Sequence, residues 1–278
     1  MAKLQAPEFT TGQVTWITKL DDLPWDDPGN PKMDFGILRL DEGQSITLDQ
    51  PLEKAILLMT GTVKMASTAA GIEDTTTTVL SRDSIFDDNP CCLHVPATST
   101  VEISAGEGPV ELAIIMTPND VSFPVTVYLP GDCRSEQRGE GTMRETSTRV
   151  VRTIFDYDNE PESNLVLGEV ITYPGKWSSY PPHHHPQPEV YHYRFLSDAG
   201  FGFAGLGDDV VKVQNGDTVT IFNVTHPQTA APGYAMWYLW AIRHLDGLPY
   251  SAPSFPIFEP EHAWVMDKDS DDKIWPFP

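Results

Sequence analysis

The sequence predicts an all-β protein built from two similar β-barrel units of the jelly-roll type. Its 25 prolines and 20 glycines fall between short apolar runs rich in Val, Ile, Thr, Tyr and Phe, which is typical of many short strands joined by turns. No stretch combines a long apolar period of about 3.6 residues with helix caps, so helices should contribute little. A loose internal repeat favours two units over one.

The repeat consists of a strand that begins with aspartate, then a histidine, then a second apolar strand. In the first half these parts lie at 83–86, at His94 and at 110–116. In the second half they lie at 217–222, at His226 and at 235–242. The aspartate and the histidine are separated by 11 residues in the first half and by 9 in the second, so the two halves share one plan.

This plan divides the chain into three segments. We expect an N-terminal unit over 1–125, a linker or crossing segment over 126–163, and a C-terminal unit over 164–278. The middle segment is polar and rich in Gly, Arg and Glu over 130–148, as connections often are. The last thirty residues contain several prolines and an acidic run at 267–272, and we expect them to wrap the surface of the second unit.

Charge and cysteine content exclude several classes of protein. The formal net charge of −22 repels phosphate backbones and anionic lipid, so we expect neither nucleic acid nor membrane as a partner. The longest apolar run, 235–242, is too short to span a bilayer. Three cysteines do not make a secreted disulfide framework, and no apolar signal segment is evident, so we expect a cytoplasmic protein. A small-molecule ligand and a homo-oligomer both remain compatible with this composition.

Histidines gather in the second half, where seven of the eight occur. Because side chains alternate along a strand, His183 and His185 should share one face and His184 should lie on the other. The same period places Glu189, Tyr191 and Tyr193 together on one face of the run 189–195. His192 and Arg194 then point outward on its opposite face.

Two imidazoles, the Glu189 carboxylate and the later His226 form a nitrogen and oxygen ligand set that suits Zn²⁺, Mn²⁺, Fe²⁺ or Ni²⁺. A barrel would bring these strands together at its mouth. The first half has His94 at the position of His226, but residues 35–60 contain no His-x-His. We therefore expect one divalent metal per chain, in the C-terminal unit, and none in the N-terminal unit.

Several motifs resemble the 5-deoxy-glucuronate isomerase family of myo-inositol catabolism. They are Gly175-Lys176-Trp177-Ser178-Ser179-Tyr180-Pro181-Pro182-His183-x-His185, Glu189-Val190-Tyr191, Arg138-Gly139-x-Gly141-x-x-Arg144 and His262-Ala263-Trp264. The resemblance covers about 35–265. It implies a bicupin, related to 4-deoxy-5-ketouronate isomerases, whose metal positions match His183, His185, Glu189 and His226.

The chain departs from the family pattern around these ligands. His184 and Pro186 replace a lysine and an aspartate, and only three residues separate His185 from Glu189, where the family commonly has a longer loop. The turn before His226 reads Phe222-Asn223-Val224-Thr225 in place of the family's Pro-Arg-Gly-Tyr. These changes affect the rim of the pocket and leave the ligands in place.

The resemblance implies an aldose–ketose isomerase that converts 5-deoxy-glucuronate to 5-dehydro-2-deoxygluconate, with Zn²⁺ or Mn²⁺ as the expected metal. Candidates for the proton-transferring residue are Tyr191, Tyr193 and His262. Candidates for binding the sugar acid are Arg138, Arg144, Arg243 and Tyr238. Two alternatives use the same ligands: a cupin dioxygenase with Fe²⁺ or Ni²⁺, and a non-catalytic sugar-binding cupin.

Overall fold

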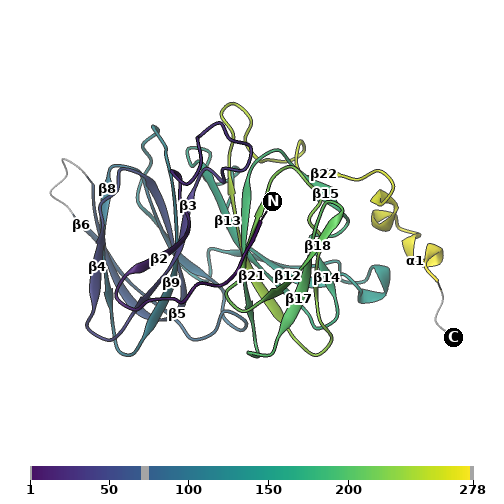
Figure 1. Ribbon diagram of the computed structural model, residues 1–278, viewed down its shortest axis with the longest axis horizontal. Coiled ribbons are helices and arrows are strands. Elements are labelled where there is room, and N and C mark those ends of the chain that lie inside the picture. Colours follow the sequence, from purple (N-terminus) through teal and green to yellow (C-terminus); the bar gives the residue numbers. More distant parts are fainter. Residues whose placement is uncertain (1, 70–74, 276–278) are drawn as a thin grey trace.

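The structure, a computed structural model, describes residues 2–69 and 75–275, and β-strands dominate it. The described helical elements are three single turns: η1 (Met143–Glu145), η2 (Ala263–Met266) and α1 (Ser270–Lys273). Figure 1 shows two lobes side by side, with the first half of the chain in one and most of the second half in the other. The all-β class is confirmed. No described helix is long and apolar enough to cross a membrane.

The first lobe consists of antiparallel strands from β2 to β10. They are β2 (Val14–Thr18), β3 (Asp34–Leu40), β4 (Ser45–Leu48), β5 (Glu53–Ala69), β6 (Thr75–Arg82), β7 (Cys91–Val95), β8 (Ser99–Ala105), β9 (Val110–Thr117) and β10 (Thr126–Tyr128).

The long strand β5 joins the two faces of this lobe. Its first part pairs with β7 and β9, and its second part pairs with β6 and β8. The register shifts between Leu58 and Thr60, and the strand then passes Gly61, whose φ is +98°. A Cβ at Gly61 would lie 2.5 Å from the Pro109 carbonyl oxygen, so only glycine permits this bend. The bend closes the lobe around Leu38, Ile56, Val63, Ile103 and other apolar side chains.

The second lobe contains the remaining strands in three sheets. They are β1 (Ala2–Leu4), β11 (Arg134–Arg138), β12 (Arg149–Phe155), β13 (Leu165–Thr172), β14 (Trp177–Ser178), β15 (His183–His184), β16 (Glu189–Phe195), β17 (Phe201–Leu206), β18 (Asp209–Gln214), β19 (Thr218–Ile221), β20 (Gln228–Ala230), β21 (Met236–Arg243) and β22 (Ile257–Phe258). The seven-stranded sheet has the order β1-β19-β16-β21-β13-β12-β11 and the four-stranded sheet β14-β20-β17-β18, while β15 pairs with β22.

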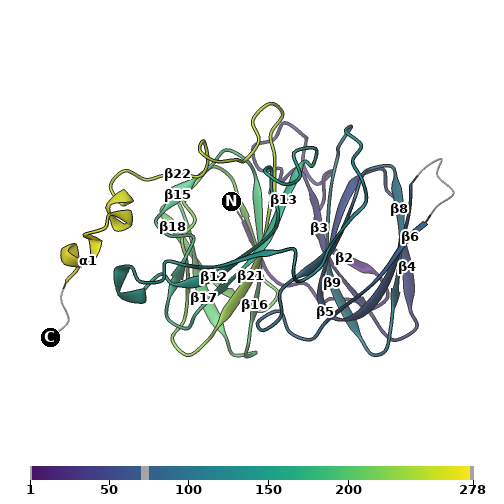
Figure 2. The ribbon, with the colours of Figure 1, turned by 180° about the vertical axis from the view of Figure 1, so that it is seen from behind.

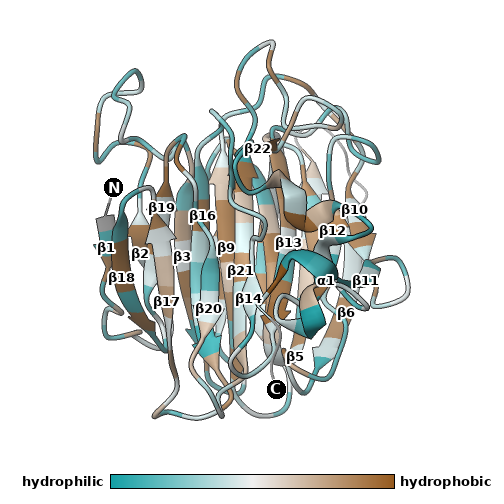
Figure 3. Cartoon of the chain, turned by 90° about the vertical axis from the view of Figure 1, so that its right-hand side faces the viewer, coloured by the Kyte–Doolittle hydropathy of each residue, from teal (hydrophilic) through white to brown (hydrophobic). Residues whose placement is uncertain are grey.

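The central strands of the seven-stranded sheet are buried on both faces. One face packs on the four-stranded sheet through a core that includes Val170, Tyr193 and Phe195. The other face packs on the first lobe, where Val190, Trp237 and side chains such as Phe35 share one cluster. Figure 2 shows the two lobes side by side from behind, and Figure 3 shows apolar residues along the strands. This double burial explains why β13 and β21 are apolar on both sides.

Two expectations change at this level. Among the described strands no sheet closes on itself by hydrogen bonds, so each lobe is a sandwich of open sheets and not a closed barrel. The face of β16 expected to point outward is covered by the first lobe: His192 is fully buried, and its ring packs against Phe35 with centroids 5.4 Å apart. Arg194 on the same face reaches Glu111 of the first lobe at 2.6 Å.

The expected division into segments stays a prediction. The segment 126–163 contains β10, β11 and β12, of which β11 and β12 belong to the seven-stranded sheet. The first strand, β1, crosses to the second lobe and pairs with β19. Lys3 holds it there through an ion pair of 2.8 Å with Asp217.

Candidate metal centre

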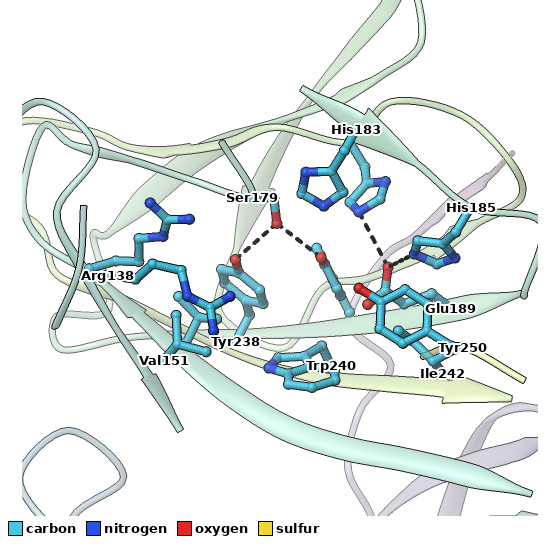
Figure 4. A pocket seen from close by; sticks show the side chains of 14 residues that line it. Arg138, Val151, Ser179, His183, His185, Glu189, Tyr238, Trp240, Ile242 and Tyr250 are labelled. Carbon is cyan, nitrogen blue, oxygen red and sulfur yellow. Dashed lines mark hydrogen bonds and ion pairs between the residues drawn. The ribbon is translucent and has the colours of Figure 1, made fainter. Parts of the chain in front are cut away.

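Three buried side chains converge at one end of the second lobe. Glu189 opens β16, His185 precedes it by four residues, and His226 lies between β19 and β20. The Nε2 atoms of His185 and His226 lie 3.3 Å and 3.5 Å from the same Glu189 oxygen, Oε2. One ligand atom from each residue lies within 4.8 Å of the others, and each residue is at most 2% exposed. Figure 4 shows His185 directed at this carboxylate.

His183 lies beside this triad. Its ring centroid is 4.8 Å from that of His226, and the planes are nearly perpendicular. The strand β15 that carries it is held by β22, with His183 opposite Phe258. His183 is outside the 4.8 Å group, so its role as a fourth ligand stays a prediction.

The tautomer of each histidine is determined by a backbone carbonyl. The Nδ1–H groups of His183, His185 and His226 donate to the carbonyl oxygens of Pro181, Gln187 and Val224, at 2.8, 2.9 and 2.9 Å. A carbonyl can only accept, so each Nδ1 carries the hydrogen and each Nε2 presents a lone pair. Such carbonyl-held imidazoles are the arrangement found around protein metal ions.

Burial also controls the charges in the cluster. It lowers the pKa of His183 and His185 to about 4 and that of His226 to about 3, so the three rings are neutral at neutral pH. Burial raises the pKa of Glu189 to about 7, against the opposing influence of His226 and a hydrogen bond with Tyr191. Two nitrogen lone pairs facing one carboxylate oxygen require a proton or a cation between them. The donor set therefore fits a divalent metal.

The alternation predicted for the His-His-His segment is confirmed. His184 points away from the triad, and its Nδ1 lies 2.7 Å from Glu259 Oε1. It lines a separate, open cavity together with His262. His262 thus lies outside the cavity of the triad, and the structure does not bring this candidate to the site.

A cavity of about 100 Å³ adjoins the triad. Its lining comes mainly from β12, β13, β16 and β21 and consists of Arg138, Arg149, Val151, Val170, Ser179, His183, His185, Glu189, Tyr191, His226, Tyr238, Trp240, Ile242 and Tyr250. Arg138 and Tyr250 also line two further cavities, of about 180 and 330 Å³, that adjoin it. The three cavities therefore share part of their lining.

Three hydroxyl groups meet inside this cavity. Ser179 adopts a left-handed backbone with φ of +49°, and its Oγ lies 3.0 Å from the Tyr191 hydroxyl and 3.3 Å from the Tyr238 hydroxyl. A non-glycine residue in this conformation carries strain, which is common at functional sites. Tyr193 is on the same strand face but deeper, where its hydroxyl donates to Gln228 Oε1 at 2.8 Å. Of the three predicted proton-transfer residues, only Tyr191 lines the cavity.

The predicted arginines separate in the same way. Arg138 lines the cavity, whereas Arg144 lies by the C-terminal segment and donates to the Trp275 carbonyl at 3.3 Å. Arg243 turns toward the first lobe and contacts Thr117 and Asp246.

The sequence reasoning missed Arg149, Ser179 and Tyr250. Arg149 was not predicted as a site residue because its strand, β12, lies in the segment that we expected to be a linker. A period of two over 149–153 would have placed Arg149 beside Val151 on one face.

The described residues of the first lobe form no equivalent centre. His94 is buried and its Nε2 lies 2.8 Å from Glu53 Oε1, while its ring stacks on Phe155 with centroids 4.3 Å apart. Over residues 2–69 and 75–275, the His185, Glu189 and His226 group is the only one with metal-ligand spacing.

Comparisons with known proteins agree with this description. The family model described as KduI/IolB matches residues 4–265. A 5-deoxy-glucuronate isomerase of Geobacillus kaustophilus is 29% identical, and the match covers 96% of each chain. A 5-deoxy-glucuronate isomerase of Geobacillus thermodenitrificans is 28% identical over 84% of this chain and 86% of its own.

Solved structures show the same fold. An IolB-like protein of Salmonella typhimurium superposes with a TM-score of 0.81 at 22% identity, covering 96% of this chain and all of its own. An oxalate decarboxylase of Lactobacillus farciminis superposes with a TM-score of 0.59 at 11% identity, covering 78% of each chain. At these identities the likeness concerns the cupin-like architecture alone.

Proposed function

This chain belongs to the KduI/IolB family, and we propose that it is a metal-dependent aldose–ketose isomerase that converts 5-deoxy-glucuronate to 5-dehydro-2-deoxygluconate. The family expected from the sequence motifs is confirmed, and with it the isomerase class of enzyme. The substrate, the metal and the roles of individual residues are our proposal. The relatives named 5-deoxy-glucuronate isomerase support the choice of substrate.

The proposal rests on one observation, which is that three chemically different groups of side chains line the same cavity. A neutral histidine pair with a carboxylate, a tyrosine and serine hydroxyl cluster, and two arginines all line the same space. Aldose–ketose isomerisation of a sugar acid needs each of them: oxygen-binding groups at the carbonyl, a proton carrier, and a cation for the carboxylate.

We assign the metal to His185, Glu189 and His226, with His183 as the fourth ligand. When bound there, a divalent ion would polarise the carbonyl and hydroxyl oxygens of the sugar and favour loss of the proton on the adjacent carbon. The three histidines can ligate without losing a proton, because burial keeps them neutral. Their carbonyl partners keep each Nε2 directed at the site.

Tyr191 is the proposed proton carrier. Burial raises its pKa well above the ordinary value, so the phenol keeps its hydrogen at neutral pH and can give it to one sugar oxygen only while it accepts the proton of the neighbouring hydroxyl. Ser179 Oγ connects it to Tyr238, which gives a short path for a proton between the hydroxyl oxygens. Trp240, Ile242 and Val151 line the same cavity and exclude water from this exchange.

The test is turnover by the purified, metal-analysed protein. We expect conversion of 5-deoxy-glucuronate under anaerobic conditions, its arrest by a chelator, and its return with Zn²⁺ or Mn²⁺. Tyr191→Phe should lower kcat by roughly 100-fold, the ordinary contribution of a positioned acid or base, and retain the metal. If uronic and deoxy-uronic acids are inert with every divalent metal while oxygen is consumed, the proposal fails in favour of a dioxygenase.

A further inference from the structure

Arg149 is a buried cation without a carboxylate partner. It is 7% exposed, and it is one of four buried arginines in the described chain. The other three pair with carboxylates: Arg82 and Arg152 with Glu169, and Arg243 with Asp246. For Arg149, no carboxylate of residues 2–69 or 75–275 lies within ion-pair distance. Since an unpaired buried charge is costly, this residue calls for another explanation.

Backbone carbonyls hold the guanidinium in one orientation. Its Nη1 donates to the Ser147 carbonyl at 2.8 Å and its Nη2 to the Tyr180 carbonyl at 3.0 Å. Gly139 closes over this contact with φ of +84°, and a Cβ there would lie 2.8 Å from the Ser147 oxygen. The loop can therefore approach Arg149 only because position 139 is glycine. Carbonyl oxygens orient the cation but leave its charge unbalanced.

The charge is present at neutral pH and has a second cation beside it. Burial lowers the pKa of Arg149 to about 10, which still leaves it protonated. The charge of Arg138 lowers this pKa further, whereas Tyr238 and Tyr191 raise it. All three side chains therefore lie close to Arg149. Arg138 is about half exposed and already pairs with Glu136 at the surface, whereas Arg149 is enclosed.

The geometry of the cavity places this cation apart from the triad. Arg149 lines both the triad's cavity and the adjoining one of about 330 Å³, together with His183 and Tyr250. In Figure 4, Arg138 and Tyr238 lie toward one end of the drawn site, and His185 and Glu189 lie toward the other. A ligand that spans the cavity thus meets cations at one end and the triad at the other.

We propose that Arg149 binds the carboxylate of the substrate and sets the specificity for sugar acids over neutral sugars, with Arg138 as a second, outer cation. A planar, pre-oriented guanidinium suits a carboxylate, which can accept two parallel hydrogen bonds from it. This inference rests on the proposed function for the identity of the substrate, but not for the class of ligand. Any ligand of the cavity should carry one anionic group at this end.

The first experiment compares substrates in the metal-loaded, full-length protein. We expect Arg149→Met to lower kcat/KM for 5-deoxy-glucuronate on the order of 100-fold, mainly through KM. It should change kcat/KM for 5-deoxyglucose, which has a hydroxymethyl group in place of the carboxylate, by less than about 3-fold. Arg149→Lys should restore part of the loss. An equal loss on both compounds would mean that Arg149 only supports the fold, and would overturn the proposal.

The second experiment separates this proposal from the proposed function. Gluconate keeps the carboxylate but has no aldehyde, and its binding can be measured by calorimetry without turnover. We expect the wild-type protein to bind it and Arg149→Met to weaken binding by at least about 30-fold. Arg194→Met, which removes a partly buried arginine on the opposite face of β16, should leave gluconate binding unchanged.

The outcomes are distinct. Gluconate binding that depends on Arg149, in a protein that isomerises no sugar acid, would refute the proposed isomerase and sustain the carboxylate anchor. Equal binding by wild type and Arg149→Met, or no binding by wild type, would refute the anchor even if isomerisation is observed. Metal content and thermal unfolding of each variant show whether it is folded.

Discussion

Glu189 connects metal binding to folding stability, and the substitution Glu189→Gln makes this measurable. In the metal-free protein, burial raises the pKa of this carboxyl from 4.5 to about 7. The folded state therefore holds a proton that the unfolded state has released between these pH values. The free energy of unfolding must then fall as pH rises from 4.5 to 7. At about 1.4 kcal/mol per pKa unit, the loss is ~3 kcal/mol.

Glutamine has a similar shape and no charge, so the variant should lack this loss. Without metal we expect Glu189→Gln to be more stable than the wild type by ~3 kcal/mol at pH 8, with the difference vanishing near pH 4.5. The neighbouring histidines, whose pKa values are lowered, destabilise both proteins as pH falls below 6.5. Their contribution largely cancels in the comparison.

The assay is urea unfolding over pH 4.5–8 with a chelator, repeated with saturating Zn²⁺ or Mn²⁺. Metal should reverse the order, because it stabilises the wild type by binding the folded state and binds the variant weakly. The reasoning is refuted if the metal-free variant is no more stable than the wild type at pH 8. It is also refuted if the difference does not depend on pH.

Three further predictions concern the site and its support. His185→Ala should abolish tight binding of one metal ion per chain, whereas His94→Ala should retain it. Metal analysis after dialysis measures the number of bound ions. Two equivalent ions in the wild type would contradict the asymmetry of the lobes. Glu169→Gln should lower the free energy of unfolding in urea by ~3 kcal/mol, because it leaves two guanidinium groups buried between the lobes without a carboxylate. A loss below about 1 kcal/mol would show that these two ion pairs contribute little to stability. Deleting 256–278 removes β22, the strand that pairs with His183 and His184. We expect the truncated protein to bind the metal more weakly, with an unchanged far-ultraviolet spectrum. An unaltered metal affinity would show that β22 does not position the ligands.

The sequence by itself determined the features that follow from local periodicity. Alternation along a strand separated His184 from its two neighbours and aligned Glu189 with Tyr191, because successive side chains point to opposite faces whatever surrounds them. The prolines and glycines between short apolar runs determined the all-β class, and specific motifs determined the family. The triad could be predicted from the sequence because His185 and Glu189 are only four residues apart along the chain.

Tertiary structure decided which groups share the cavity and which faces are covered. Arg149 reaches the site because β12 lies beside β13, and Tyr250 arrives from a loop after β21. Neither pairing follows from a local period, since each depends on contacts between distant segments. The packing of the first lobe buried His192 and turned Arg243 away from the cavity. A strand's period tells which side chains face together, but only the neighbouring layer determines whether that face meets solvent, another lobe or a substrate.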